Sequence, residues 1–294
     1  MMLPYFAESG SLPAPLPTED ELESAESLPS IYPPDLRRNV IVRGRYVVKY
    51  GSGVKENEGR ALLALEKYPS IPSLKLYAMY RQDDKLYIVM EFKRGIQLDE
   101  VWSSIPEPVK SDVITQLRMI MDSMRKIPSA GIFGSVSHVH VPHRFFWTPV
   151  PYPQINGPFE HEQDFSMAMA ERSQCAWDEE ISRTNRSWVS GWLARNLPTV
   201  LRGHPSVFTH GDFQRKNILV EKVAVKDGIE SSQWRVTALL DWEDAGWYPS
   251  YWEYASCFVD FGMEEEWPEY LEGILEPFPL ESGLLKVVRQ DIDY

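Results

Sequence analysis

The sequence has few cysteines, a shortage of basic residues and no long apolar run. Its 294 residues include only Cys175 and Cys257, too few for a disulfide framework. This scarcity is typical of a reducing compartment, and we expect a cytoplasmic protein. No apolar stretch approaches the length that spans a bilayer. The amino terminus lacks a basic region followed by an apolar run, so no signal peptide is predicted.

The charge balance excludes some classes of partner. The chain has 30 Lys and Arg residues against 43 Asp and Glu residues, a net charge of −13. Nucleic acids and anionic membrane surfaces both require a basic face, so neither is an expected partner. A cationic, amine-bearing substrate would suit the acidic charge only weakly, and general solubility explains that charge better.

One stretch of the sequence carries a pattern that indicates chemistry. Asp212 stands five residues ahead of Asn217, between two apolar runs, and Asp241 ends a later apolar run. Phosphoryl transfer uses one Asp to accept the proton of the attacking hydroxyl, and an Asn and a second Asp to hold Mg²⁺. Mg²⁺ prefers oxygen ligands and takes only one or two from a protein. We therefore predict Asp212 as the base and Asn217 and Asp241 as metal ligands.

These motifs resemble a known family. The pattern His-Gly-Asp-x-x-x-x-Asn at 210–217, followed by Asp-Trp-Glu at 241–243, resembles the aminoglycoside phosphotransferase and choline kinase group of small-molecule kinases. Segments 47–51, 157–159 and 241–255 look like the fungal-type branch of this family, and the resemblance runs from about Val40 to about Gly262. The family shares the protein-kinase fold.

The resemblance also assigns residues that bind ATP. It implies that Lys49 pairs with the α- and β-phosphates. The residues around Lys49, taken alone, favour an ordinary solvated strand lysine, and the downstream motifs reverse that preference. A helix expected over 56–65 would supply a glutamate to hold Lys49 in place. Glu58 matches the family, and Glu56 is the alternative. The run 86–92 resembles the strand before the kinase hinge, so that Glu91 and Phe92 would bond the adenine through their backbone.

Two departures from the protein-kinase pattern bear on the substrate. No G-x-G-x-x-G motif precedes Lys49, which leaves the nucleotide clamp undefined. Gly211 occupies the position where protein kinases have an arginine that reads a phosphorylated activation loop. Only a few residues separate Asp241 from the helix expected at Trp252, which leaves no room for such a loop, so we expect a small-molecule acceptor. We interpret His210 as structural, because no Gly-x-Ser-x-Gly turn supports hydrolase chemistry.

The expected fold is an α+β, protein-kinase-like, two-lobe fold. Residues 1–35, rich in Pro, Ser and acids, read as a flexible or loosely docked leader. Residues 36–94 would form a small nucleotide-binding lobe with an antiparallel sheet and one helix. Residues 95–294 would form a larger, mostly helical lobe for catalysis and substrate binding, in which Pro198 ends a helix.

Together these patterns predict an enzyme that transfers the γ-phosphate of ATP, with Mg²⁺, to a hydroxyl of a small molecule. Branches of the family act on choline, ethanolamine, sugars or amino-acid alcohols, and nothing in the sequence selects among them. Glu243 and Asp244 would lie near the metal or the acceptor. The alternative is a catalytically inactive kinase-fold protein that binds a nucleotide or a partner.

Overall fold

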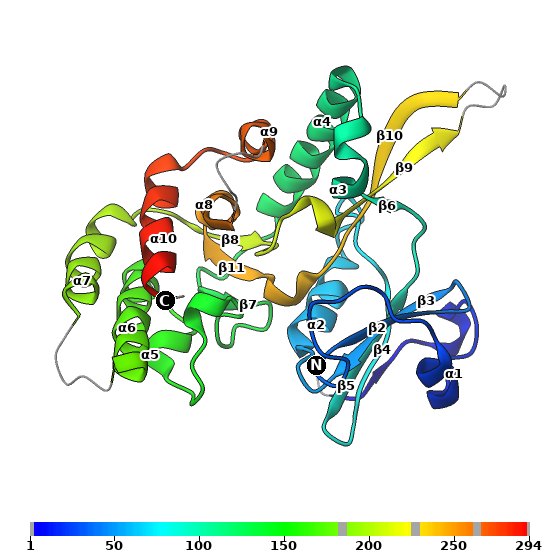
Figure 1. The fold of residues 1–294 in the computed structure, drawn as a ribbon, viewed down its shortest axis with the longest axis horizontal. Coiled ribbons are helices and arrows are strands. Elements are labelled where there is room, and N and C mark those ends of the chain that lie inside the picture. Colours follow the sequence, from blue (N-terminus) through cyan, green and yellow to red (C-terminus); the bar gives the residue numbers. More distant parts are fainter. Residues whose placement is uncertain (1–2, 182–186, 225–229, 261–265, 293–294) are drawn as a thin grey trace. The chain divides into compact units, whose positions relative to one another are not determined.

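The computed structural model describes residues 3–181, 187–224, 230–260 and 266–292, which form a mixed α+β fold (Figure 1). The chain divides into two compact units. The first contains residues 1–105 and 215–243, and the second contains 106–214 and 244–294. The predicted fold class is confirmed, but this division differs from the expected one at residue 94. A segment from the later half of the sequence returns to the first unit.

An antiparallel five-stranded sheet forms the centre of the first unit, in the order β1-β4-β5-β3-β2. Its elements are β1 (Tyr5–Phe6), β2 (Arg38–Val42), β3 (Tyr46–Gly51), β4 (Leu76–Gln82) and β5 (Lys85–Glu91), with helix α2 (Glu56–Leu65) between β3 and β4. The β2–β3 hairpin turns through Arg43 and Gly44, both with positive φ, as tight hairpins require. Alternating apolar residues of these strands, such as Val40 and Val48, are fully buried.

The amino-terminal segment is ordered against this sheet, which differs from the flexible or loosely docked leader expected from the sequence. Strand β1 pairs with β4, and η1 (Ser9–Ser11) and α1 (Glu19–Ser24) follow. Helix α1 begins with a capping box at Thr18 and buries Leu22. Three arginines around the β2–β3 hairpin donate to backbone carbonyls of the segment at 2.7–2.8 Å: Arg38 to Ala25, Arg43 to Pro15 and Arg45 to Pro13. These bonds replace the apolar periodicity that the segment lacks.

A second, three-stranded sheet completes the first unit, in the order β10-β9-β6. Its strands are β6 (Ile96–Gln97), β9 (Ile218–Ala224) and β10 (Glu230–Leu239), and the short helices are α3 (Leu98–Val101), η2 (Trp102–Ser104) and η4 (Arg215–Asn217). Strand β10 ends two residues before Asp241, and η5 (Trp242–Asp244) follows. This sheet therefore positions the carboxylate that the sequence assigned to the metal.

The second unit is mostly helical. Its helices are α4 (Glu107–Arg125), α5 (Pro153–Asn156), α6 (Glu162–Ile181), α7 (Trp188–Val200), α8 (Trp252–Asp260), α9 (Trp267–Ile274) and α10 (Pro279–Ile292), with η3 (Arg144–Phe146). A small sheet has the order β7 (Gly134–Ser135), β11 (Gly246–Pro249) and β8 (Ser206–Thr209). Fully buried aromatic rings fill the core, with Trp252 against Phe165 and Tyr248. Helix α7 continues through Pro198, which the sequence analysis expected to end it.

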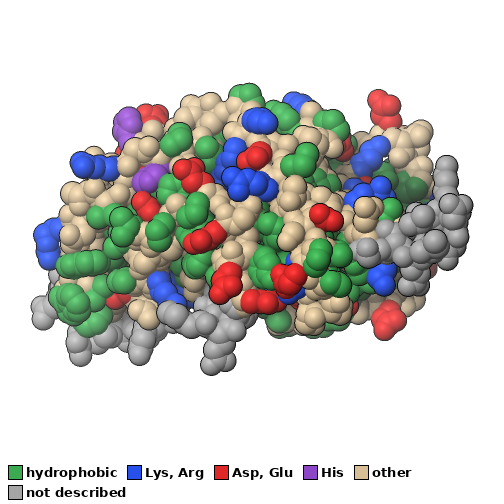
Figure 2. Space-filling model, turned by 90° about the horizontal axis from the view of Figure 1, so that it is seen from above, with side chains coloured by type: hydrophobic (Ala, Val, Ile, Leu, Met, Phe, Trp, Pro, Cys, Tyr) green, Lys and Arg blue, Asp and Glu red, His purple; other side chains and the backbone are tan. Residues whose placement is uncertain are grey.

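The described residues carry charges of both signs on their surface (Figure 2). On the face shown in Figure 2, acidic and basic side chains of the described residues are interspersed, without a continuous basic area. No helix in the described part of the chain is both long and apolar enough to cross a membrane.

Candidate active site

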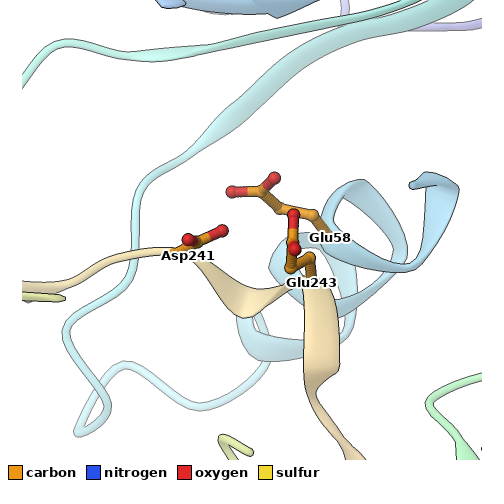
Figure 3. Close-up of side chains that lie close together, drawn as sticks. All are labelled: Glu58, Asp241 and Glu243. Carbon is orange, nitrogen blue, oxygen red and sulfur yellow. The ribbon is translucent and has the colours of Figure 1, made fainter. Parts of the chain in front are cut away.

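Lys49 is the centre of a buried charge cluster in the first unit. Its Nζ donates to Glu58 Oε2 and Asp241 Oδ1, each at 2.7 Å, and to Glu243 Oε2 at 3.2 Å. Figure 3 shows that Glu58 extends from helix α2, while the two other carboxylates extend from the turn after β10. Lys49 is 5% exposed and Glu58 is 3% exposed. The pairing that the sequence suggested for Lys49 with Glu58, rather than with Glu56, is therefore present.

The same geometry shifts the pKa values in the cluster. Burial lowers the pKa of Lys49, but the charges of Glu58, Asp241 and Glu243 outweigh it and raise that pKa above its ordinary value. Burial raises the pKa of Glu58 to about 7; the charge of Lys49 opposes this, and the neighbouring carboxylates add to it. For Glu243, burial is outweighed by the surrounding cations, chiefly Lys49, and its pKa is lowered. Lys49 therefore remains a cation that binds anions.

Glu243 collects further contacts that sequence reasoning missed. Arg37 Nη2 donates to Glu243 Oε2 at 2.6 Å, and Lys55 Nζ lies 3.7 Å from Oε1. Asn57 Nδ2 donates to the backbone carbonyl of Glu243 at 2.9 Å. The sequence offered little to identify Arg37, because it lies more than 200 positions from its partner.

Three carboxylates of the cluster form a group that could hold a metal ion. One oxygen each of Glu58, Asp241 and Glu243 lie within 4.8 Å of one another. The other expected ligand, Asn217, is tied to the residue before Asp241, because its backbone carbonyl accepts the N–H of Leu240 at 2.8 Å. Asp241 itself has a φ of 59°, a left-handed conformation that is uncommon for a non-glycine residue. Carboxylate and carboxamide oxygens are the donors that Mg²⁺ prefers, so this donor set fits that ion.

The predicted base lies in the second unit, on a tightly held loop. Asp212 donates its N–H to His210 Nδ1 at 3.2 Å, and its Oδ1 accepts from Gln214 Nε2 at 2.6 Å. The N–H groups of His210 and Gly211 donate to the carboxylate of Glu253, at 2.6 and 3.1 Å. Both His210 and Glu253 are fully buried. His210 thus packs and bonds within the loop.

Two features of this loop depend on single residues. Gly211 has a φ of +87°, and a Cβ there would lie 2.4 Å from the carbonyl oxygen of Asp244, so only glycine fits. Glu253 was missed as a functional residue, although the sequence contained a signal. It is a glutamate in the otherwise apolar run Trp-Glu-Tyr-Ala at the start of α8. A buried carboxylate needs donors, and here they are the backbone of the Asp212 loop.

The expected adenine-binding residues lie apart from the charge cluster. In the β3–β5 register Lys49 faces Ile88, which is three residues from Glu91. The N–H of Glu91 donates to Lys75 O at 2.9 Å, and that of Phe92 donates to Arg45 O at 3.0 Å. Both backbone donors are thus already engaged within the first unit. An adenine ring at this strand end would have to bond to other groups, such as carbonyl oxygens.

Solved structures of small-molecule phosphotransferases are similar to this chain. APH(2'')-IIa, in a ternary complex with streptomycin and ATP, is 13% identical with a TM-score of 0.56, over 93% of this chain and 86% of that one. The GDP complex of aminoglycoside 2'-phosphotransferase-IIIa is 15% identical with a TM-score of 0.55, over 93% and 83%. A choline/ethanolamine kinase family protein from Mesorhizobium loti is 14% identical with a TM-score of 0.50, over 92% and 76%. At such low identity the likeness shows the fold.

The family itself is shown by the sequence. No curated protein matches this chain significantly. However, residues 36–278 match the phosphotransferase enzyme family (APH). The matched region includes Lys49, Glu58, the Asp212 loop and Asp241, and it spans well over half of the chain. The chain therefore belongs to the phosphotransferase enzyme family.

Proposed function

We propose that this phosphotransferase transfers the γ-phosphate of ATP to a hydroxyl of a small molecule, with Mg²⁺, in a reducing compartment such as the cytoplasm. The observation that carries the proposal is the Lys49 cluster, in which a buried cation meets Glu58 and Asp241 at 2.7 Å each. A lysine fixed in this way is suited to phosphate oxygens. The family membership and the nucleotide complexes of the similar structures support the same activity.

Each residue has a defined task in this proposal. Lys49 binds and orients the nucleotide phosphates, and Glu58 fixes the Lys49 side chain. Asp241 and Asn217 hold Mg²⁺, which supplies positive charge to the phosphate oxygens when it is bound. The carboxylate of Asp212 orients the acceptor hydroxyl and takes its proton. The rigid loop around Asp212 supports this role, because a positioned base needs a fixed backbone.

The acceptor is proposed by its chemistry. It is a small compound with a hydroxyl group, and an amine on it would suit a chain with a net charge of −13. Among the similar structures, APH(2'')-IIa and an APH(3'')-Id from Streptomyces rimosus are complexes with streptomycin. These complexes make amine-bearing alcohols the first compounds to screen.

The decisive experiment measures ATP binding by calorimetry, with and without Mg²⁺, for the wild type and for Asp241→Ala. We expect Mg²⁺-dependent binding by the wild type and its loss in the variant, because the variant removes a metal ligand. Absence of ATP binding by the wild type in both conditions would refute the proposal. It would leave a kinase-fold protein that acts without ATP.

The base is tested separately with Asp212→Asn. We expect the variant to bind Mg²⁺ and ATP like the wild type but to transfer phosphate about 10²–10⁴-fold more slowly. An acceptor found in the screen, with ADP release as the readout, provides the assay. Transfer at the wild-type rate would show that Asp212 is not the base.

A further inference from the structure

The sequence before Lys49 has no glycine-rich motif, so another segment that precedes Lys49 would have to contact the nucleotide phosphates. We propose that the segment 32–37 takes this place and that Arg37 binds the phosphates directly. This inference rests on the proposed function, since it concerns the same nucleotide. It assigns a phosphate-binding role to a residue outside the motifs of the sequence analysis.

The segment is fixed against the strand that carries Lys49. The N–H groups of Leu36 and Arg37 both donate to Pro33 O, at 3.0 and 2.9 Å, which closes a tight turn. The N–H of Gly53 donates to Leu36 O at 2.9 Å. A Cβ on Gly51, which has a φ of +147°, would lie 2.3 Å from Leu36 O. Gly51, the last residue of β3, and Gly53 therefore allow close packing of this turn, which positions Arg37.

Arg37 has the properties of an anion-binding residue with bonding capacity to spare. Its side chain is 8% exposed, its guanidinium lies 4.2 Å from the ring centroid of Tyr32, and its Nη2 bonds to Glu243. Among the described residues, its buried Nε has no hydrogen-bond partner. A guanidinium offers five donors in a planar fork that matches phosphate oxygens, and a buried donor without an acceptor is costly. The unmatched Nε indicates that an acceptor is missing.

The neighbours of Arg37 indicate which acceptor that is. Arg37 Nη2 and Lys49 Nζ contact the same atom, Glu243 Oε2, at 2.6 and 3.2 Å. Two cations that share one oxygen lie close enough for the adjoining phosphates of a single nucleotide. A mononucleotide polyphosphate is therefore the ligand class that both would bind, with Lys49 and Arg37 on neighbouring groups.

Binding of the nucleotide would also preserve the charge pairing of the cluster. In the structure, Asp241 and Glu243 neutralise Lys49 and Arg37. If Asp241 and Glu243 turn to Mg²⁺, Arg37 loses its carboxylate partner and Lys49 keeps only Glu58, which is unfavourable unless other anions replace them. The phosphates of the nucleotide are those anions. A merely structural Arg37 would have no need of them.

The test compares ligands with and without phosphates. Calorimetry measures the affinities for ATP with Mg²⁺ and for adenosine in the wild type, Arg37→Met and Arg37→Lys. We expect Arg37→Met to weaken ATP binding about 10- to 100-fold, the effect of a lost charge-assisted bond, and to leave adenosine binding unchanged. Arg37→Lys keeps the charge without the fork, so its loss should be smaller. Arg81→Met is the control. It removes a half-exposed arginine of β4 that pairs with Glu56 of α2, and the variant should bind both ligands normally.

The outcomes separate this inference from the proposed function. Unchanged ATP binding in Arg37→Met, or equal losses for ATP and adenosine, would overturn the role of Arg37 while the wild type still binds ATP. Failure of the wild type to bind ATP would overturn the proposed function and this inference together. If Arg37→Met does not fold, Arg37→Lys decides. Full ATP affinity in Arg37→Lys, together with a structure in which the lysine no longer contacts Glu243, would show that the Arg37 guanidinium does not bind the phosphates.

Discussion

Replacement of Glu253 by Gln tests how the Asp212 loop is held. The fully buried carboxylate accepts the N–H groups of His210 and Gly211 through its two oxygens, at 2.6 and 3.1 Å. Glutamine keeps the shape but turns one acceptor into a donor, so one buried N–H loses its partner. Such a loss costs about 1–3 kcal/mol of unfolding free energy. The pKa of partly buried Arg125 is lowered by burial and raised by the charge of Glu253. Arg125 also loses this neighbouring anion in the variant, which favours the upper end of that range.

Thermal unfolding measures this cost. A change of 1 kcal/mol lowers Tm by about 2–4 °C in a protein of 150 to 250 residues, so Glu253→Gln should melt roughly 2–12 °C below the wild type. Glu272→Gln is the matched control. Glu272 is an exposed glutamate of α9 that accepts from the hydroxyl of Tyr254 at 3.0 Å, and Tyr254 lies on α8 next to Glu253. A surface change of this kind stays within about 0.5 kcal/mol. Equal Tm values for the two variants would refute the argument that the carboxylate holds the loop.

Three further substitutions test other parts of the structure by thermal unfolding. Gly211→Ala should lower Tm more than Gly203→Ala, since both glycines have positive φ but only the former approaches another backbone, at 2.4 Å from Asp244 O. Equal effects would show that conformation alone matters. Lys49→Met should destabilise the chain and make Mg²⁺ raise its Tm more than that of the wild type, because three carboxylates lose their shared cation. A variant that does not respond to Mg²⁺ would contradict the metal assignment. Leu22→Ala should cost about 2–5 kcal/mol, the usual range for a buried leucine, whereas a loosely attached leader would show almost no change.

Local patterns were sufficient for the elements that carry the charge cluster. The helix predicted over 56–65 is α2, with its bounds intact, because its apolar spacing and its early glutamates are features of a single segment. The hairpin around Gly44 follows from turn chemistry in the same way. The Lys49–Glu58 pair follows from the family resemblance, and its residues are only nine positions apart. Such features can be predicted from the sequence because residues close together along the chain determine them.

The remaining features depend on contacts that no local pattern encodes. Arg37 reaches Glu243 across 206 positions, and Glu253 reaches the backbone of His210 across 43. The amino-terminal segment looked flexible because it lacks periodic apolar residues, yet arginines 13 to 32 positions away bind its carbonyls. Backbone acceptors leave no signature in side-chain composition. Sequence reasoning therefore identified the motifs but underestimated what supports them.

The charge cluster explains how one site can be both stable and ready to bind. Three carboxylates with oxygens within 4.8 Å would repel one another in a buried position, and Lys49 and Arg37 remove that repulsion. The same contacts occupy the groups that are proposed to bind metal and phosphate. Binding is then an exchange of partners rather than an addition of new charge, so either ligand alone would leave buried charges unpaired. Because coupling between two ligands is reciprocal, this arrangement favours Mg²⁺ and nucleotide binding together over the binding of either one.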